Sequence, residues 1–92
     1  MTIHLKDPDA TVDYLIDWGA RLDGRAVTES DWAVAPAEPG GLVIADDAID
    51  GARTRARLSG GVPGHVYRAT CQVVLSDGGI DERSLALRVE QR

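Results

Sequence analysis

The chain has 92 residues, of which 43% are hydrophobic and 27% are charged, a balance typical of globular proteins rather than disordered ones. Its net charge of −5 at pH 7 argues against binding to nucleic acid or to an anionic membrane through overall attraction. With two Trp, two Tyr and no Phe, the core has to be built mainly from aliphatic side chains. We therefore expect a single domain over residues 1–92 with one modest core.

The N-terminal ten residues lack the basic region and apolar run of a secretory signal, and no stretch is long and apolar enough to cross a bilayer. Cys71 is the only cysteine, so no disulfide framework can form within the chain. We expect the protein to be made in a reducing compartment without secretion. The expected role of Cys71 is that of a small buried hydrophobic residue.

The first strand signal covers residues 12–18, where side chains alternate with a period of two. The expected buried face consists of Val12, Tyr14, Ile16 and Trp18. Asp13 and Asp17 then point to water, whereas a helix would spread the apolar side chains around its circumference. Farther along, Asp23 and Gly24 predict a turn, and residues 32–34 predict a second, short strand.

Residues 35–41, APAEPGG, contain two prolines and two glycines, which predicts a loop or a crossing at a sheet edge. Residues 42–45 form a short apolar run, which is followed by an aspartate-rich segment. Residues 52–58 alternate small or apolar side chains with arginines. This pattern predicts a strand whose outward face carries a row of guanidinium groups about 7 Å apart. The row consists of Arg53, Arg55 and Arg57.

The last third of the chain carries two long alternating segments joined by the turn at residues 77–79. The expected inward faces are Tyr67, Ala69, Cys71, Val73 and Leu75 on the first, and Leu85, Leu87 and Val89 on the second. About seven short strands in some ninety residues predict an all-β fold, an antiparallel immunoglobulin-like β-sandwich. Tyr67 is placed like the corner tyrosine before the sixth strand, although Cys71 follows it by four residues rather than two.

Charge is unevenly distributed along the chain. Residues 1–50 carry 3 basic and 11 acidic side chains, and residues 51–92 carry 7 basic and 4 acidic ones. One interpretation is that the two halves interleave in space and neutralise each other. The other is a module with an acidic and a basic surface that meet different neighbours in an assembly. The sequence leaves both open.

No residues have the spacing of catalytic or metal-binding machinery. His4 and His65 are far apart in sequence, and neither lies in a nucleophile or zinc-ligand motif. Asp7 and Asp9, with the aspartates of residues 46–50, offer hard oxygen ligands suited to calcium, but their ordinary role is to begin turns. We expect no enzymatic activity, no cofactor and no metal.

The arginine row has two interpretations. It suits contacts with carboxylates of a partner protein, or it is a solvated strand face that pairs with neighbouring carboxylates or protects an edge strand. The two tryptophans, Trp18 and Trp32, also allow two interpretations. One of them is expected in the core, and the other lies either in the core or at an exposed contact. The candidate interface residues are Asp7, Asp9, Arg53, Arg55, Arg57 and Trp32.

Three segments carry a family resemblance: LKDPDATVDYLIDW, SDWAV and LSGGVPGHVYRATCQVVLSDGGIDERSLALRV. Together they resemble a family of small tailed-bacteriophage proteins, the fiber-tail adaptors, over nearly the whole chain, with residues 35–52 matching least. The residues that fit the family pattern are Lys6, Asp7, Pro8, Asp9, Asp13, Tyr14, Asp17, Trp18, Trp32, Leu58, Ser59, Gly60, Gly61, Gly64, Tyr67, Thr70 and residues 81–85.

The resemblance implies a non-enzymatic immunoglobulin-like component of a phage or prophage virion, synthesised in the bacterial cytoplasm, that joins tail and fiber proteins. Its expected partners are other phage structural proteins and further copies of itself, not nucleic acid or membrane. Two other functions stay open: a head-tail connection or head-completion protein, and a surface- or carbohydrate-binding module. The latter would be expected to show a shallow groove with an exposed Trp18 or Trp32.

Overall fold

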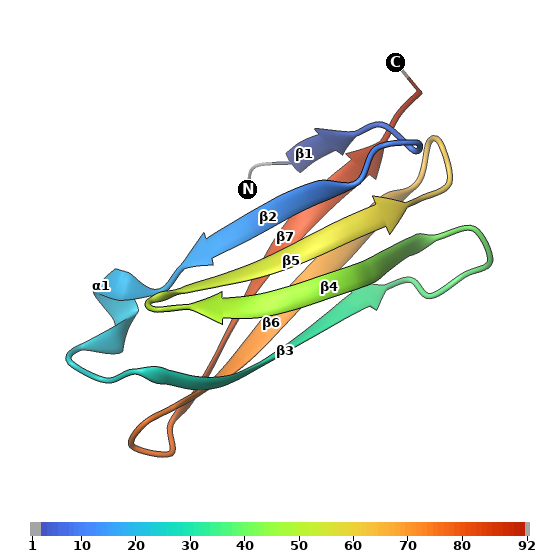
Figure 1. Ribbon diagram of the computed structural model, residues 1–92. Helices are drawn as coiled ribbons and strands as arrows, with labels where there is room; N and C mark the ends of the chain where they lie inside the picture. Colours follow the sequence, from blue (N-terminus) through green and yellow to red (C-terminus); the bar gives the residue numbers. More distant parts are fainter. Residues whose placement is uncertain (1–2, 92) are drawn as a thin grey trace.

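The computed structural model describes residues 3–91, which form seven strands and one short helix. These are β1 Ile3–Lys6, β2 Val12–Asp17, α1 Gly19–Leu22, β3 Val27–Ala35, β4 Leu42–Asp50, β5 Arg53–Gly60, β6 Val66–Leu75 and β7 Ile80–Val89. The strands run along the long axis of an elongated body (Figure 1), whose principal extents are 42 × 22 × 18 Å.

Two sheets face each other, one with the order β1-β7-β6-β3 and the other with the order β2-β5-β4. All neighbours are antiparallel except β1 and β7, which pair in parallel. The orders β7-β6-β3 and β2-β5-β4 are those of the G-F-C and B-E-D strands of an immunoglobulin-like sandwich. The expected fold class is therefore confirmed, and β1 joins the four-stranded sheet.

The core lies between the sheets and forms one cluster of buried side chains. On β2, β5, β6 and β7 the inward residues are those that the alternating pattern predicts, with Leu58, Ala69, Cys71, Val73, Leu87 and Val89 fully buried. Trp18 and Trp32 are both buried, Trp32 with 7% of its surface exposed. Because two large indoles fill a mainly aliphatic core, each contributes much of the buried apolar area.

A polar bridge crosses this core. The Trp18 indole N–H donates to Thr54 Oγ1 over 2.9 Å, and the Cys71 thiol lies 3.4 Å from the same oxygen. Thr54 belongs to β5 and Cys71 to β6, so the hydroxyl links the two sheets. Burial raises the pKa of the Cys71 thiol. Its buried, protonated state agrees with the expected role of a small hydrophobic residue.

Tyr67 forms the corner that the sequence suggested. Its hydroxyl accepts a hydrogen bond of 3.0 Å from the backbone N–H of Val62, five residues upstream, as a tyrosine corner does at the start of the sixth strand. The preceding turn contains Gly61, whose φ is +108° and whose Cα is so close to Val89 that a Cβ would lie 2.5 Å from it. Glycine is therefore required where this turn packs against β7.

Four features differ from the expectation. The strand β1 was not expected, because the first strand signal was placed at residues 12–18. β3 has nine residues rather than three, because a bulge between Val27 and Glu29 breaks the alternation in the sequence. β4 continues through the aspartates to Asp50, with a bulge between Ile44 and Asp46 that places Asp47 on the inward side. The helix α1 was not expected. It is a single turn that ends at the predicted turn, where Asp23 has a φ of +49°.

Candidate protein-contact surfaces

The arginine row lies on the outer face of the three-stranded sheet. β5 is the central strand between β2 and β4, so the row does not protect a sheet edge and that interpretation is wrong. Each arginine has a carboxylate within 4 Å on a neighbouring strand. The pairs are Arg53–Asp17 at 3.8 Å, Arg55–Asp13 at 3.6 Å, Arg55–Asp46 at 3.6 Å and Arg57–Asp13 at 2.9 Å. This set is called the arginine ladder below.

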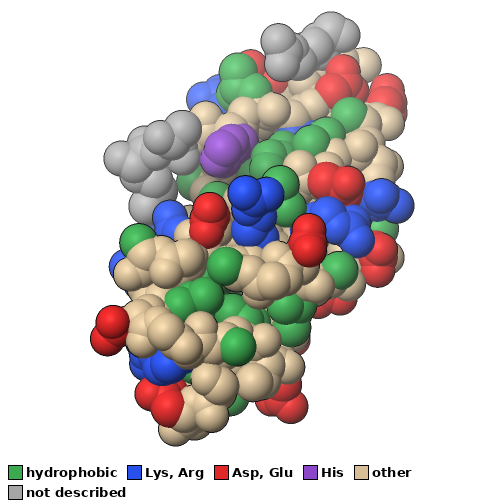
Figure 2. Space-filling model, turned by 60° about the vertical axis from the view of Figure 1, so that its left-hand side comes forward, with side chains coloured by type: hydrophobic (Ala, Val, Ile, Leu, Met, Phe, Trp, Pro, Cys, Tyr) green, Lys and Arg blue, Asp and Glu red, His purple; other side chains and the backbone are tan. Residues whose placement is uncertain are grey.

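The arginine ladder neutralises charge within the molecule. Arg57 lowers the pKa of Asp13, first by its hydrogen bond of 2.9 Å and then by its charge, and Asp13 raises the pKa of Arg57 in return. All of these side chains keep more than a quarter of their surface exposed. Ion pairs of this kind are weak and screened by salt, so they can exchange partners when another protein approaches. Figure 2 shows basic and acidic side chains next to one another rather than in separate patches.

Asp7 and Asp9 lie in the turn between β1 and β2. Asp7 Oδ1 accepts the backbone N–H of Asp9 over 2.8 Å, and the backbone carbonyl of Asp7 accepts the N–H of Ala10. The neighbouring Lys6 is 1% exposed, and its ammonium donates to the backbone carbonyls of Asp7 and Gly60. Burial lowers the pKa of Lys6, opposed by the two nearby aspartates. These hydrogen bonds fix the conformation of the turn. The turn lies at the Arg57 end of the arginine ladder, where Val12 pairs with Leu58.

Trp32, the remaining candidate contact residue, lies in the core, so its side chain offers almost no surface to a partner. Its indole N–H has no hydrogen-bond partner within residues 3–91. Trp18 is fully buried beneath Arg83, whose guanidinium lies 5.9 Å from the centre of the indole ring and donates to the carbonyl of Asp17. Neither indole forms the exposed platform that a carbohydrate-binding module would be expected to show.

Sequence reasoning missed a cluster at one end of the sandwich. Glu38, in the loop between β3 and β4, accepts hydrogen bonds from the Tyr67 hydroxyl and lies 2.8 Å from His65 Nδ1. The Tyr67 and His65 contacts lower the pKa of Glu38, and burial raises the pKa of Tyr67. Glu38 is 27 positions from His65 and 29 positions from Tyr67 along the chain. In the sequence, only the tyrosine corner could have indicated that the loop between β3 and β4 folds over the Tyr67 end of the sandwich.

A second missed contact closes the edge where β7 extends beyond the short β1. Arg21 lies in α1, and its Nη1 donates to both carboxylate oxygens of Asp81 over 2.9 and 3.0 Å. Asp81 is the first residue of the DERSL segment, and Arg83 covers Trp18 from the same strand. Backbone hydrogen bonding to Glu82 and the contact with Arg21 lower the pKa of Asp81. This segment of the family pattern therefore has a structural role in joining β7 to the α1 region.

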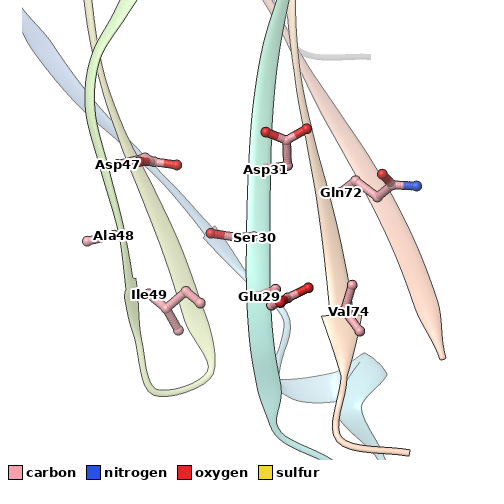
Figure 3. Close-up of a pocket in the computed structure, with 8 residues that line it drawn as sticks. All are labelled: Glu29, Ser30, Asp31, Asp47, Ala48, Ile49, Gln72 and Val74. Atoms are coloured by element: carbon pink, nitrogen blue, oxygen red, sulfur yellow. The ribbon is translucent and has the colours of Figure 1, made fainter. Parts of the chain in front are cut away.

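A groove of about 610 Å³ lies between the free edges of β3 and β4. It is lined by Glu29, Ser30, Asp31, Asp47, Ala48, Ile49, Gln72 and Val74. Figure 3 shows Ser30 pointing towards β4, with Asp47 and Ile49 pointing towards β3. The inward charge of Asp47 and the two bulges hinder unspecific pairing of these edges with another sheet. The sequence did not reveal the groove, because neither the expected strand at residues 32–34 nor the apolar run at residues 42–45 includes a residue that lines it.

Within residues 3–91, no three His, Cys, Asp or Glu side chains are placed so that they could hold a metal ion. The aspartates weighed as calcium ligands lie apart: Asp7 and Asp9 in a turn, and the others along β4. No helix in this part of the chain has the length and hydropathy needed to cross a membrane.

One family model matches the chain over residues 6–88, and its description is podophage GP4 fiber-tail adaptor protein gp77. No curated protein matches the sequence. The matched range includes all of the sandwich from the end of β1 to the penultimate residue of β7, and with it the Lys6 turn, the tyrosine corner and the DERSL edge. The chain therefore belongs to the podophage GP4 fiber-tail adaptor family, gp77, a family of structural phage tail proteins.

Proposed function

We propose that this protein joins tail and fiber components of a podophage or related prophage particle through protein-protein contacts, without enzymatic activity. The observation that carries the proposal is the family match over residues 6–88. The structure agrees with a structural role in one respect: the polar clusters described above hold loops and strands together. On this proposal the protein is made in the bacterial cytoplasm and ends up in the virion.

We propose that the contact surface includes the arginine ladder and the adjacent turn with Asp7 and Asp9. The two are neighbours at one end of the three-stranded sheet, because β2 begins where β5 ends. A partner carboxylate can replace an aspartate of the ladder at small cost, since exposed ion pairs contribute little in the free protein. Several copies around a tail would strengthen individually modest contacts. Trp32 would act only indirectly, by holding β3 in place.

Single-particle electron microscopy of induced phage particles tests this function. We expect density for the sandwich at the junction between tail and fibers. Density at the neck would instead assign a head-completion role, and absence from purified particles would contradict any structural role in the virion.

A variant series tests the surface. Arg53→Gln, Arg55→Gln and Arg57→Gln together remove the positive charge without creating repulsion, and circular dichroism checks that the variant folds. We expect assembled particles that have lost fibers. Arg21→Gln, an exposed arginine paired with Asp81 elsewhere on the molecule, is the control and should leave fiber content unchanged. Normal fibers in the triple variant would show that the arginine ladder is not the contact surface.

A further inference from the structure

The outer face of the four-stranded sheet separates its charges along the strands. The register aligns outward side chains of β7, β6 and β3 in rows across the sheet. From one end to the other, the rows are Arg88 and Val66; Ala86, Arg68 and Ala35; Ser84, Thr70 and Ala33; Glu82, Gln72 and Asp31; and Ile80, Val74 and Glu29. One end is basic, the other is acidic, and the middle row is small and uncharged.

Most charged side chains on this face have no ion-pair partner among the described residues. Within residues 3–91, Arg68, Asp31 and Glu82 make no ion pair, whereas Arg88 pairs with Glu90 at 2.8 Å. The face is also apolar at both ends. Ile3 and Leu5 of β1, Val66 of β6 and Ile80 of β7 are each at least half exposed.

This pattern is complementary to itself when turned end to end. A twofold axis that crosses the strands at the middle row would place β6 over β6 and β7 over β7 of a second copy. Val66 would then lie opposite Val74, and Arg68 opposite Gln72, with Asp31 and Glu82 of the second copy on either side. Ile80 would lie over the aliphatic stem of Arg88, between Leu5 and Val66. Apolar residues meet apolar ones, and each basic end meets an acidic end.

We propose that this face binds a second copy of the same chain in an antiparallel, twofold-symmetric dimer. The inference goes beyond the proposed function, because it requires no other phage protein. The longest strands of this sheet, β6 and β7, have ten residues, so its four strands give a face of at most about 33 Å by about 14 Å. This is smaller than the roughly 800 Å² per partner of a standard interface. The dimer is therefore weak. Its ion pairs between Arg68 and the carboxylates of the second copy are reached by solvent, so the affinity falls further as the salt concentration rises.

Sedimentation equilibrium of the purified full chain tests the dimer, with protein concentrations up to about 1 mM at low and high salt. We expect a monomer–dimer equilibrium at low salt. Arg68→Glu should raise the dissociation constant at least tenfold, because it places like charges opposite each other twice per dimer. Asp31→Lys combined with Glu82→Lys should do the same. Mixing the two variants should restore dimers, since every facing pair is again of opposite sign.

Arg53→Glu, on the outer face of the other sheet, changes the net charge equally and is the matched control. It should dimerise like the unmodified chain. A chain that stays monomeric at all concentrations would overturn the proposal, as would a dimer unaffected by Arg68→Glu or a mixture that fails to restore association. Because the measurement uses this protein alone, such a result would leave its position in the particle to be decided separately by microscopy.

Discussion

The outer faces of the two sheets differ in how they arrange charge. On the three-stranded sheet, each arginine of β5 stands between strands that carry aspartates, and the contacts run across the sheet. On the four-stranded sheet, Arg68 lies between uncharged neighbours, and the carboxylates Asp31 and Glu82 lie two rows away. The first face is therefore neutralised by its own strands, whereas the second leaves both charge signs to solvent or to another molecule.

This difference shows that uneven charge along a sequence has two structural outcomes in the same sandwich. The acidic first half and the basic second half interleave in the arginine ladder, as one interpretation of the sequence held. The other interpretation, an acidic and a basic surface that meet different neighbours, stays a prediction. Register makes the difference, because aspartates of β2 and β4 pair directly with Arg53 and Arg57 of β5, whereas the residues of β3 and β7 that pair with Arg68 are alanines.

The largest expected change in the free energy of unfolding comes from a substitution on the inner side of the four-stranded sheet, compared with one on its outer side. Leu87 is fully buried on β7, and Leu5 is half exposed on β1 of the same sheet. Leu87→Ala should lower the free energy of unfolding by about 2–5 kcal/mol, because it removes buried apolar area and leaves a cavity. Leu5→Ala should cost less than about 0.5 kcal/mol but weaken self-association. Urea denaturation and sedimentation measure the two properties, and equal unfolding costs would contradict the assigned faces.

An intermediate effect is expected where the two sheets meet. Thr54→Val keeps the shape of the side chain but removes the oxygen that accepts from Trp18 and contacts Cys71. The buried indole N–H then has no acceptor, so the free energy of unfolding should fall by about 1–3 kcal/mol. Thr28→Val is the matched control, because the Thr28 hydroxyl donates to a backbone carbonyl at an exposed site of β3. Similar denaturation midpoints for the two variants would show that the bridge does not stabilise the core.

The smallest effect is expected in the arginine ladder. Asp13→Asn removes contacts to Arg55 and Arg57, and because these pairs are exposed we expect the melting temperature at pH 7 to fall by about 4 °C or less. The pKa of Asp13 is lowered in the folded state. The ionised carboxylate therefore stabilises the folded protein at pH values above the unfolded pKa, and this stabilisation is lost as the pH falls through the folded pKa. The melting curves of the two proteins should therefore converge in acid, and a difference that grows in acid would contradict this.

Much of the fold could be predicted from the sequence, because period-two alternation reports directly which side of a strand is buried. This holds for β2, β5, β6 and β7, whose inward residues were all expected. The corner role of Tyr67 was also visible, since it depends on a local contact with Val62. The arginine row was placed correctly on an outward face, while its neighbours could not be known before the strand order was.

The missed features share a physical cause. Bulges in β3 and β4 shift the alternation by one residue, so both strands looked shorter than they are, and the groove between them was hidden. The Glu38 cluster and the Arg21–Asp81 contact join segments that are distant in sequence. Trp32 was named as a contact residue because tryptophan suits both cores and interfaces, and only its place on the inner side of β3 assigns it to the core.

By itself, the sequence determined an all-β sandwich with an aliphatic core, a corner tyrosine and an outward row of arginines, because strand alternation and turn residues are local properties. Only the tertiary structure decided which strands became neighbours. Strand order and register together neutralise the arginines of β5 and place alanines on either side of Arg68, and the packing of the two sheets buries both tryptophans. The reason is physical: charge pairing and burial depend on distances between segments, and the fold alone brings those segments together.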